Sequence, residues 1–254
     1  MADADEGWAS LAAWYDAKQG EEGDLWHRAI IDPVLLDVLG PVRGLRLLEV
    51  ACGNGYLARR FAREGARVTA IDASAPIVAL AQRREADRPS GVEYRVAQAE
   101  RLDGLPDAGF DVAVSNMALM DIAAADGAIT EVARVVRPGG RFVFSISHPC
   151  FDLLSRSAWE IERRLFETTV YRKVSRYREL HAESTPWRIA EGSVRSTIGY
   201  HRPLSWYVGT LGRAGFAIDR FEEPLPGAEA VRESSQGPLM LEIPLHCVVG
   251  CVRR

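Results

Sequence analysis

Short apolar runs recur through the first part of the chain, and each is followed by a segment whose apolar residues return at helical spacing. In residues 56–64, for example, Leu57, Ala58, Phe61 and Ala62 fall on one helical face. The runs that we interpret as buried strands are residues 45–50, 68–71, 92–96, 110–115 and 141–146. Alternating strands and helices predict an α/β fold built on a parallel sheet.

The regions on either side of this core have different patterns. They predict, in chain order, two helices within residues 8–39, exposed strands at 168–177 and 194–200, a helix at 205–214, a strand at 216–221, a proline-rich loop at 223–237 and a last strand at 239–252. Gly215 is placed to end its helix, and Ser74 to cap the helix that follows residues 68–71. Pro244 predicts a bulge or an edge in the last strand.

The run at residues 45–50 leads into the turn Gly53-Asn54-Gly55, which we expect to bind a ligand. Glycine permits unusual backbone angles and lets a ligand approach the main chain. Gly53 to Ala58 also fits the dinucleotide pattern G-x-G-x-x-A, and Asp72 lies near the acidic position of that pattern. An NAD(P)-dependent oxidoreductase is therefore an alternative, although that pattern does not require Glu49.

The segment from Glu49 to Gly55, read as E-x-A-C-G-x-G, resembles motif I of the class I S-adenosylmethionine-dependent methyltransferases. Three later stretches are similar to the family in the same order: residues 97–100, residues 110–121 and the expected tight turn Arg137-Pro138-Gly139-Gly140. Gln98 stands where the family often has an acid, but its amide oxygen can still accept a hydrogen bond. Within the class, the chain looks most like the ubiquinone and menaquinone biosynthesis methyltransferases.

The resemblance implies a Rossmann-like, seven-stranded, mostly parallel sheet with helices on both faces, whose last strand runs antiparallel between its neighbours. It also implies four regions: an N-terminal helical cap at 1–40, a cofactor-binding core at 41–150, an acceptor-pocket insertion at 151–203, and a C-terminal helix with the last two strands at 204–254.

The resemblance implies a set of side chains and backbone groups that hold S-adenosylmethionine. Glu49 suits the cofactor's ammonium, Asp72 its ribose hydroxyls and Gln98 its adenine amino group. The backbone amide of Ala99 would meet the adenine ring, and Asn116 would begin the turn beneath the transferable methyl group. The whole expected set is Tyr15, His27, Glu49, Ala51, Gly53, Gly55, Asp72, Ala73, Gln98, Ala99, Glu100, Asn116 and Met117.

His148 is the first candidate for a proton acceptor, because it follows a core strand at the ligand-binding end and imidazole titrates near neutral pH. Its alternative role is to hydrogen-bond the backbone at the strand end. Tyr15 and His201 are further catalytic candidates, and Tyr15 would otherwise be a packing residue.

Residues 152–202 interleave aromatic and charged side chains. Three roles are equally open for the aromatic residues together with Arg172, Arg176, Arg188 and Arg195: the lining of a pocket for a planar or anionic small molecule, the outer face of a cap, or a dimer contact.

Composition and residue spacing limit the kinds of partner that we expect this protein to bind. The formal net charge is −4, and the mildly acidic chain lacks the basic character that recruits nucleic acid. We see no signal-peptide pattern and no apolar run of transmembrane length, so we expect a cytoplasmic protein that does not bind membranes. The four cysteines have no C-x-x-C spacing, and we expect no metal. A monomer and a homodimer are both compatible with the sequence.

The expected reaction is in-line displacement of the methyl group onto an O, N or C nucleophile of a small molecule, which releases S-adenosylhomocysteine. A non-catalytic protein that binds S-adenosylmethionine is the second alternative.

Overall fold

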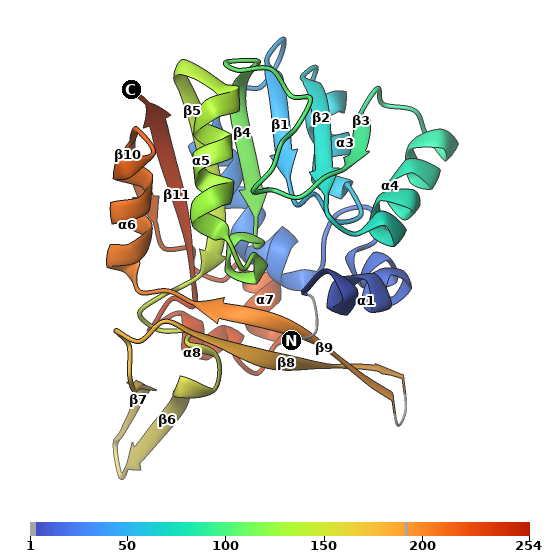
Figure 1. The fold of residues 1–254 in the computed structure, drawn as a ribbon. Helices are drawn as coiled ribbons and strands as arrows, with labels where there is room; N and C mark the ends of the chain where they lie inside the picture. The colour runs from blue at the N-terminus through green and yellow to red at the C-terminus, as the bar shows by residue number, and fades with distance from the viewer. Residues whose placement is uncertain (1–3, 191–192) are drawn as a thin grey trace.

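The computed structural model describes residues 4–190 and 193–254, and a seven-stranded sheet forms the centre of that described part (Figure 1). The sheet has the order β10-β11-β5-β4-β1-β2-β3. Its strands are β1 (Arg46–Val50), β2 (Arg67–Asp72), β3 (Glu93–Val96), β4 (Phe110–Asn116), β5 (Val136–Ser147), β10 (Phe216–Glu222) and β11 (His246–Arg253). Strand β11 is antiparallel to both of its neighbours, and the pairs among β1 to β5 are parallel. The predicted fold is confirmed.

Helices cover both faces of this sheet, because alternate residues of each strand point to opposite sides. Leu47 of β1 belongs to the apolar cluster under α2 (Asp32–Leu39), α3 (Tyr56–Arg63) and α4 (Ala75–Asp87). Leu48, the next residue, belongs to the cluster under α5 (Ala125–Val135) and α6 (Leu204–Arg213). Both leucines are fully buried, and burial of this kind stabilises the fold by roughly 1.5–3 kcal/mol per side chain.

The N-terminal region lies at the carboxyl ends of the parallel strands. It contains α1 (Ala4–Gln19) and the π-helix η1 (His27–Ile31), which continues directly into α2. Helix α1 crosses below β2 and β3, next to α4 (Figure 1). The predicted pair of helices within residues 8–39 is therefore present, although α1 begins before that range.

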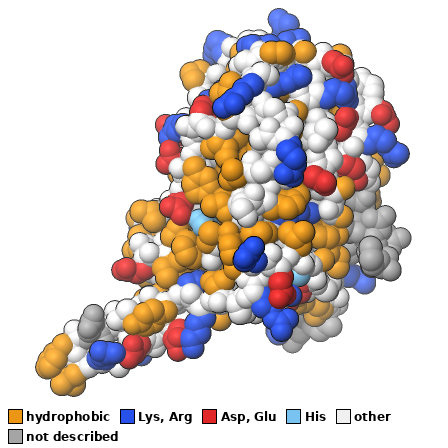
Figure 2. Space-filling model, turned by 60° about the vertical axis from the view of Figure 1, so that its left-hand side comes forward, with side chains coloured by type: hydrophobic (Ala, Val, Ile, Leu, Met, Phe, Trp, Pro, Cys, Tyr) orange, Lys and Arg blue, Asp and Glu red, His pale blue; other side chains and the backbone are white. Residues whose placement is uncertain are grey.

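The region between β5 and α6 forms two antiparallel hairpins. One pairs β6 (Ser157–Arg164) with β7 (Glu167–Val174), and the other pairs β8 (His181–Ala190) with β9 (Ser193–His201). The β8–β9 hairpin runs below the sheet and packs against α1, whereas β6–β7 projects from the body and carries hydrophobic side chains at its tip (Figures 1 and 2). The strands expected at 168–177 and 194–200 are confirmed, while β6 and β8 were not predicted.

Several predicted boundaries were wrong. Strand β5 begins at Val136, so residues 137–140 form its irregular first part and not a separate turn. The loop expected at 223–237 contains α7 (Ala228–Glu233) and leads to α8 (Gly237–Met240), and Pro244 precedes β11 instead of interrupting it. Pro238 explains why a proline-rich segment leads into α8: it occupies the first turn of that helix, where its fixed φ favours a helix start.

Candidate functional site

A cavity of about 820 Å³ lies at the carboxyl ends of the parallel strands, where an open α/β sheet binds its ligands. One side is formed by the loops after β1, β2, β3 and β4, and the other by α1, the β8–β9 hairpin and the start of β11. The predicted site residues that line it are Tyr15, His27, Ala51, Gly53, Asp72, Ala73, Gln98, Ala99, Glu100, Asn116, Met117 and His201. The structure therefore gathers most of the predicted set around one space.

Asp72 organises the glycine turn. Its Oδ2 accepts a hydrogen bond from the Gly53 amide at 3.0 Å, and its Oδ1 accepts one from the Ser74 amide at 2.9 Å. Gly53 has φ +56°, and a Cβ added there would lie 2.8 Å from the Tyr15 hydroxyl, so Tyr15 covers the turn. Burial, reinforced by the Asp72 and Asp24 charges, raises the pKa of Tyr15 far above its ordinary value, which keeps its phenol protonated.

Gly55 and Glu49 lie outside the residues that line the cavity. The structure gives a separate reason for glycine at position 55, because a Cβ there would lie 2.3 Å from the buried Tyr94 hydroxyl, and the glycine makes room for that ring. Glu49 is only 3% exposed, and its Oε2 has no hydrogen-bond partner. Burial raises the pKa of this carboxyl to about 8.

The chain between α1 and η1 brings three charged side chains to one edge of the cavity. His27 donates from Nδ1 to Asp24 Oδ1 at 2.7 Å, and Lys18 lies 3.1 Å from Asp24 Oδ2. Burial alone would raise the pKa of Asp24, but the hydrogen bond and charge of His27, together with Lys18, hold it well below its usual range. Asp24 is therefore ionised at neutral pH.

The loops after β3 and β4 complete this half of the cavity. Gln98, Ala99 and Glu100 line it directly. Asn116 donates from its amide to Asp32 Oδ1 at 2.8 Å and to the Tyr56 hydroxyl at 3.0 Å, so its orientation is fixed. The cap predicted for Ser74 was wrong, because its buried hydroxyl makes no hydrogen bond, although Ser74 precedes α4 and lines the cavity.

His148 does not suit the role of acceptor base that the sequence suggested. Its neighbours Ser147 and Pro149 line the cavity, whereas His148 does not, because successive residues of an extended chain face opposite ways. Its Nδ1 accepts from the Cys150 amide at 3.1 Å, so Nε2 carries the proton and donates to Glu223 at 2.9 Å. Burial lowers the pKa of His148 despite Glu223. Both nitrogens are engaged, and no lone pair remains to take a substrate proton.

His201, by contrast, lines the cavity and keeps one nitrogen available as a lone pair. Its Nε2 lies 2.8 Å from the Tyr177 carbonyl, which only accepts, so Nε2 carries the proton and Nδ1 does not. Burial lowers the pKa of His201, and the nearby His181, Arg156 and Arg202 charges lower it further, although the Tyr177 carbonyl opposes the change. The imidazole is therefore neutral at physiological pH.

The sequence analysis missed much of the second half of the cavity. Asp121 lines it, and burial raises the pKa of that carboxyl to about 7. Asp121 is five residues beyond Asn116 in the motif quoted above, and its position at a strand end was the available signal. Residues that also line this half but were not assigned to it are Trp8, Trp14, Trp26, Asp152, Tyr207 and His246.

Of the four arginines that the sequence offered as pocket residues, one lines the cavity. Arg172 lines the cavity, but Arg176, Arg188 and Arg195 do not. The guanidinium of Arg172 is already engaged, since it lies 3.3 Å from Asp152 and donates to the Phe151 carbonyl at 2.6 Å. Alternating strands place these arginines on outward faces, and nothing in the spacing alone revealed which face is buried.

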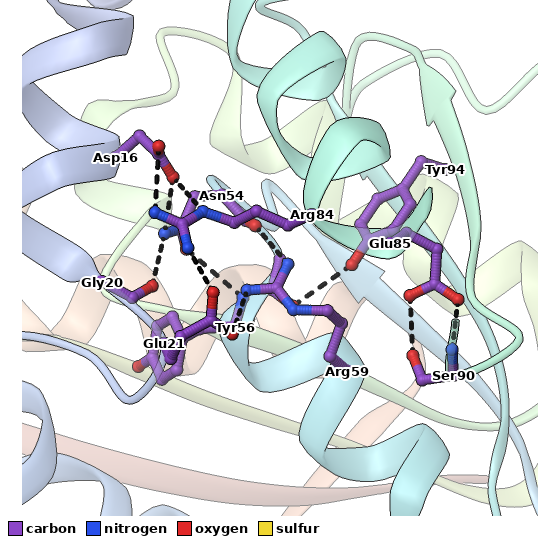
Figure 3. A network of polar contacts seen from close by, with 11 residues as sticks. Asp16, Gly20, Glu21, Asn54, Tyr56, Arg59, Arg84, Glu85, Ser90 and Tyr94 are labelled. Carbon is purple, nitrogen blue, oxygen red and sulfur yellow. Dashed lines mark hydrogen bonds and ion pairs between the residues drawn. The ribbon is translucent and has the colours of Figure 1, made fainter. Parts of the chain in front are cut away.

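A network of ion pairs fastens α1 over the glycine turn (Figure 3). Arg84 of α4 donates to both carboxylate oxygens of Asp16, at 2.6 and 3.0 Å, and also pairs with Glu21. Asn54 donates to Asp16 at 3.1 Å and to the Gly20 carbonyl at 2.9 Å. The turn and its cover are thus held by one set of contacts.

We expect Arg84→Met to loosen α1, because the two-pronged pair with Asp16 is partly buried and contributes about 1 kcal/mol after solvent screening. Amide hydrogen exchange in residues 7–19 should become several-fold faster. The matched control is Arg60→Met, which breaks only the exposed pair with Glu64. Equal exchange in both variants would contradict the role of this network.

His246 gives the fold a pH dependence. Burial lowers its pKa to about 4, His27 and His148 lower it further, Asp24 opposes them, and Nδ1 has no hydrogen-bond partner. The folded state favours the neutral ring, so this contribution to stability is complete above the ordinary pKa of 6.5 and is lost as pH falls toward 4. Urea unfolding at two pH values should show the parent losing more stability on acidification than His246→Gln. A parallel loss in both proteins would contradict it.

Comparison with known proteins gives a consistent result. A family described as "Methyltransferase domain" matches residues 48–144. An uncharacterized methyltransferase of Mycobacterium tuberculosis is 40% identical over 116 residues, which are 45% of this chain and 57% of that protein. A ubiquinone biosynthesis O-methyltransferase of Alkalilimnicola ehrlichii is 35% identical over 141 residues, which are 54% of this chain and 56% of that protein. The match thus spans little more than half the length of these relatives.

Solved structures extend the similarity to nearly the whole chain. An S-adenosylmethionine-dependent methyltransferase from Mesorhizobium loti is 29% identical, with a TM-score of 0.70 over 92% of this chain and all of that one (100%). A putative one from Listeria monocytogenes shares the fold at 24% identity, with a TM-score of 0.72 over 91% of this chain and 96% of that one.

Two further observations concern the described residues alone. None of their helices combines the length and the apolar character that crossing a membrane requires. Across residues 4–190 and 193–254, no three His, Cys, Asp or Glu side chains gather as metal ligands would. The sheet order, the glycine turn with Asp72 and the matches above agree: residues 48–144 match a methyltransferase domain, and the fold is that of the class I S-adenosylmethionine-dependent methyltransferases.

Proposed function

We propose that this protein transfers the methyl group of S-adenosylmethionine to a small molecule. One observation carries the proposal: a single cavity runs from the glycine turn and the loop after β3 to the aromatic side chains of α1 and the β8–β9 hairpin. A cofactor bound at the first end would face an acceptor at the second end within the same cavity.

The residues present fit the cofactor. Asp72 borders the cavity at the position that suits ribose hydroxyls, and Gln98 borders it where the adenine amino group would lie. Asp24, ionised between His27 and Lys18, suits the ammonium of the amino acid end. The buried Ser74 Oγ has no hydrogen-bond partner among the described residues, and Ser74 lines the cavity, as expected of a site that binds a polar ligand.

The charge of the lining supports the same assignment. Three basic side chains and six acidic ones border the cavity: Lys18, Arg172 and Arg202, and Asp24, Asp72, Glu100, Asp121, Asp152 and Glu183. S-adenosylmethionine carries a sulfonium and an ammonium, so an acidic lining attracts it. A pyrophosphate-bearing dinucleotide would meet repulsion here.

The bound cofactor supplies an electrophilic methyl group. The protein's contribution is to align the acceptor with that group and to exclude water, and orientation of this kind lowers a barrier by roughly 7–11 kcal/mol at best. We assign covering of the cofactor to residues 1–40, in which Tyr15 lies over Gly53, and binding of the acceptor to residues 151–203. His201 remains a candidate base, because its Nδ1 carries no proton.

The test is methyl transfer itself. Purified protein is incubated with methyl-labelled S-adenosylmethionine and pools of small molecules that differ in nucleophile, namely phenols, alcohols, amines and activated carbons. Mass spectrometry should find a labelled product and an equal amount of S-adenosylhomocysteine. Tight cofactor binding without transfer to any pool would instead indicate a non-catalytic binding protein.

A further inference from the structure

Asp121 is an acid that the fold leaves without a counter-charge. It lies in the short 3-10 helix η2 (Leu119–Asp121) after β4, and its side chain lines the cavity. Among the described residues, its carboxylate takes part in no hydrogen bond and no ion pair that the structure records, and only its backbone amide is bonded, to the Ala118 carbonyl at 2.8 Å. A carboxylate without a counter-charge is unfavourable in its ionised form, so ionisation of Asp121 destabilises the folded state.

Arg202, a cation that contacts the loop carrying Asp121, forms no recorded ion pair with that acid. Arg202, at the end of β9, donates to three carbonyls of the same loop: Leu119 at 3.3 Å, Ile122 at 2.7 Å and Ala123 at 2.8 Å. Its guanidinium also stacks on Tyr200 and Trp206, 5.2 and 4.9 Å from the ring centres. Arg202 therefore braces the loop that carries Asp121 and is already occupied.

The other basic groups of the cavity are likewise matched. Lys18 pairs with Asp24, and Arg172 pairs with Asp152. Glu183 of β8 accepts from the Ser155 hydroxyl at 2.7 Å, whereas Asp121 has no recorded partner for its carboxylate within the described part of the chain. Many aromatic rings line the same cavity, and the faces of such rings attract cations. The tryptophan and tyrosine rings that line it are those of Trp8, Trp14, Tyr15, Trp26, Trp159, Trp187, Tyr200 and Tyr207.

Resting on the methyltransferase function proposed above, we propose that the acceptor is a primary or secondary amine whose ammonium binds Asp121 among these rings, and that Asp121 removes the proton that blocks attack. An anionic acceptor would be repelled by this carboxylate, and a neutral hydroxyl would donate a hydrogen bond to it without supplying a counter-charge.

The step balances as follows. The ammonium R–NH3⁺ gives one proton to the Asp121 carboxylate, which leaves R–NH2 with a free electron pair. That pair forms the N–CH3 bond as the C–S bond breaks, and S-adenosylhomocysteine leaves with the sulfur electrons. The product R–NH2⁺–CH3 carries the positive charge that the sulfonium loses. No oxidant, reductant or metal takes part.

The same carboxylate predicts an unusual pH dependence of stability. Its folded pKa of about 7 exceeds the ordinary 3.8, so the folded state favours the protonated acid, and parent stability falls as pH rises between these values. The charged or titratable groups that neighbour it are Tyr207, Arg202 and His201. We expect Asp121→Asn to raise the melting temperature most above about pH 7 and not at all near pH 4. A gain that does not depend on pH would contradict an acid that the fold leaves without a counter-charge.

The binding test uses three probes with one aromatic skeleton: 2-phenylethylamine, 2-phenylethanol and phenylacetate. Each is titrated calorimetrically into protein saturated with S-adenosylhomocysteine. The parent should bind the amine about tenfold or more tightly than the alcohol, with phenylacetate weakest, because the ion pair and the ring faces together contribute at least 1.4 kcal/mol. Asp121→Asn should lose the preference for the amine and keep its affinity for S-adenosylhomocysteine.

The control is Asp126→Asn, which removes an exposed acid from the first turn of α5 and should leave all three affinities unchanged. Asp121→Glu should restore part of the preference. Equal binding of amine and alcohol by the parent, or a preference that persists in Asp121→Asn, would overturn the amine proposal alone. Failure of the parent to bind S-adenosylhomocysteine would overturn the proposed function together with it.

Discussion

Replacing Asp72 by alanine should weaken the binding of S-adenosylhomocysteine by about 100-fold. Two ribose hydroxyls would donate to this carboxylate, and hydrogen bonds to a charged group contribute about 1.5–3 kcal/mol each, so a loss near 3 kcal/mol is expected. The variant also deprives the Gly53 and Ser74 amides of their acceptor, which loosens the turn under the ligand. Calorimetric titration measures the effect directly.

Two further proteins make this result specific. Asp72→Asn keeps the shape and one acceptor oxygen but loses the charge, so its affinity should fall between those of the parent and the alanine variant. Asp87→Ala, at the exposed end of α4, should bind like the parent. Unchanged affinity in Asp72→Ala would contradict the assignment of this carboxylate to the ligand.

Replacing Gly55 by alanine should destabilise the fold by about 3 kcal/mol, because two costs combine. The residue has φ +74°, which disfavours a side chain, and the new Cβ would lie 2.3 Å from the Tyr94 hydroxyl and 2.6 Å from its ring. Tyr94 is only 8% exposed, and its hydroxyl donates to the Gly55 carbonyl, so the ring has little freedom to move. Urea unfolding provides the measurement.

Gly104→Ala is the matched control for this prediction. Gly104 also has positive φ, +78°, but a Cβ there would meet nothing within 4 Å. It should therefore cost only about 1 kcal/mol, the backbone term alone. If the two variants lost the same stability, steric contact with Tyr94 would not be the reason for glycine at position 55.

The fold could be predicted because its signals are local. Apolar runs, helical spacing and the glycine turn lie within short stretches. Asp72 could be recognised because it stands at the end of an apolar run. The structure confirms the parallel core strands predicted from these local signals, and it confirms the antiparallel β11 that the family resemblance implied. The sequence also indicated most of the cofactor half of the cavity, since those residues follow the strand ends in order.

The acceptor half could not be predicted in the same way, because it depends on which direction side chains face. His148 stands directly between the cavity-lining Ser147 and Pro149, and only the backbone path decides which of the three reaches the site. Asp121 became a candidate only when its lack of a partner was visible, and that depends on Arg202, far along the chain, being held by carbonyls. Distant pairings of this kind leave no local pattern.

The most direct test of the central claim is calorimetric titration of the parent protein with S-adenosylhomocysteine, with NAD titrated under the same conditions. We predict saturable binding of S-adenosylhomocysteine at one site and no binding of NAD. Binding of NAD alone would contradict the account and would indicate that the glycine turn binds a dinucleotide, as in an NAD(P)-dependent oxidoreductase.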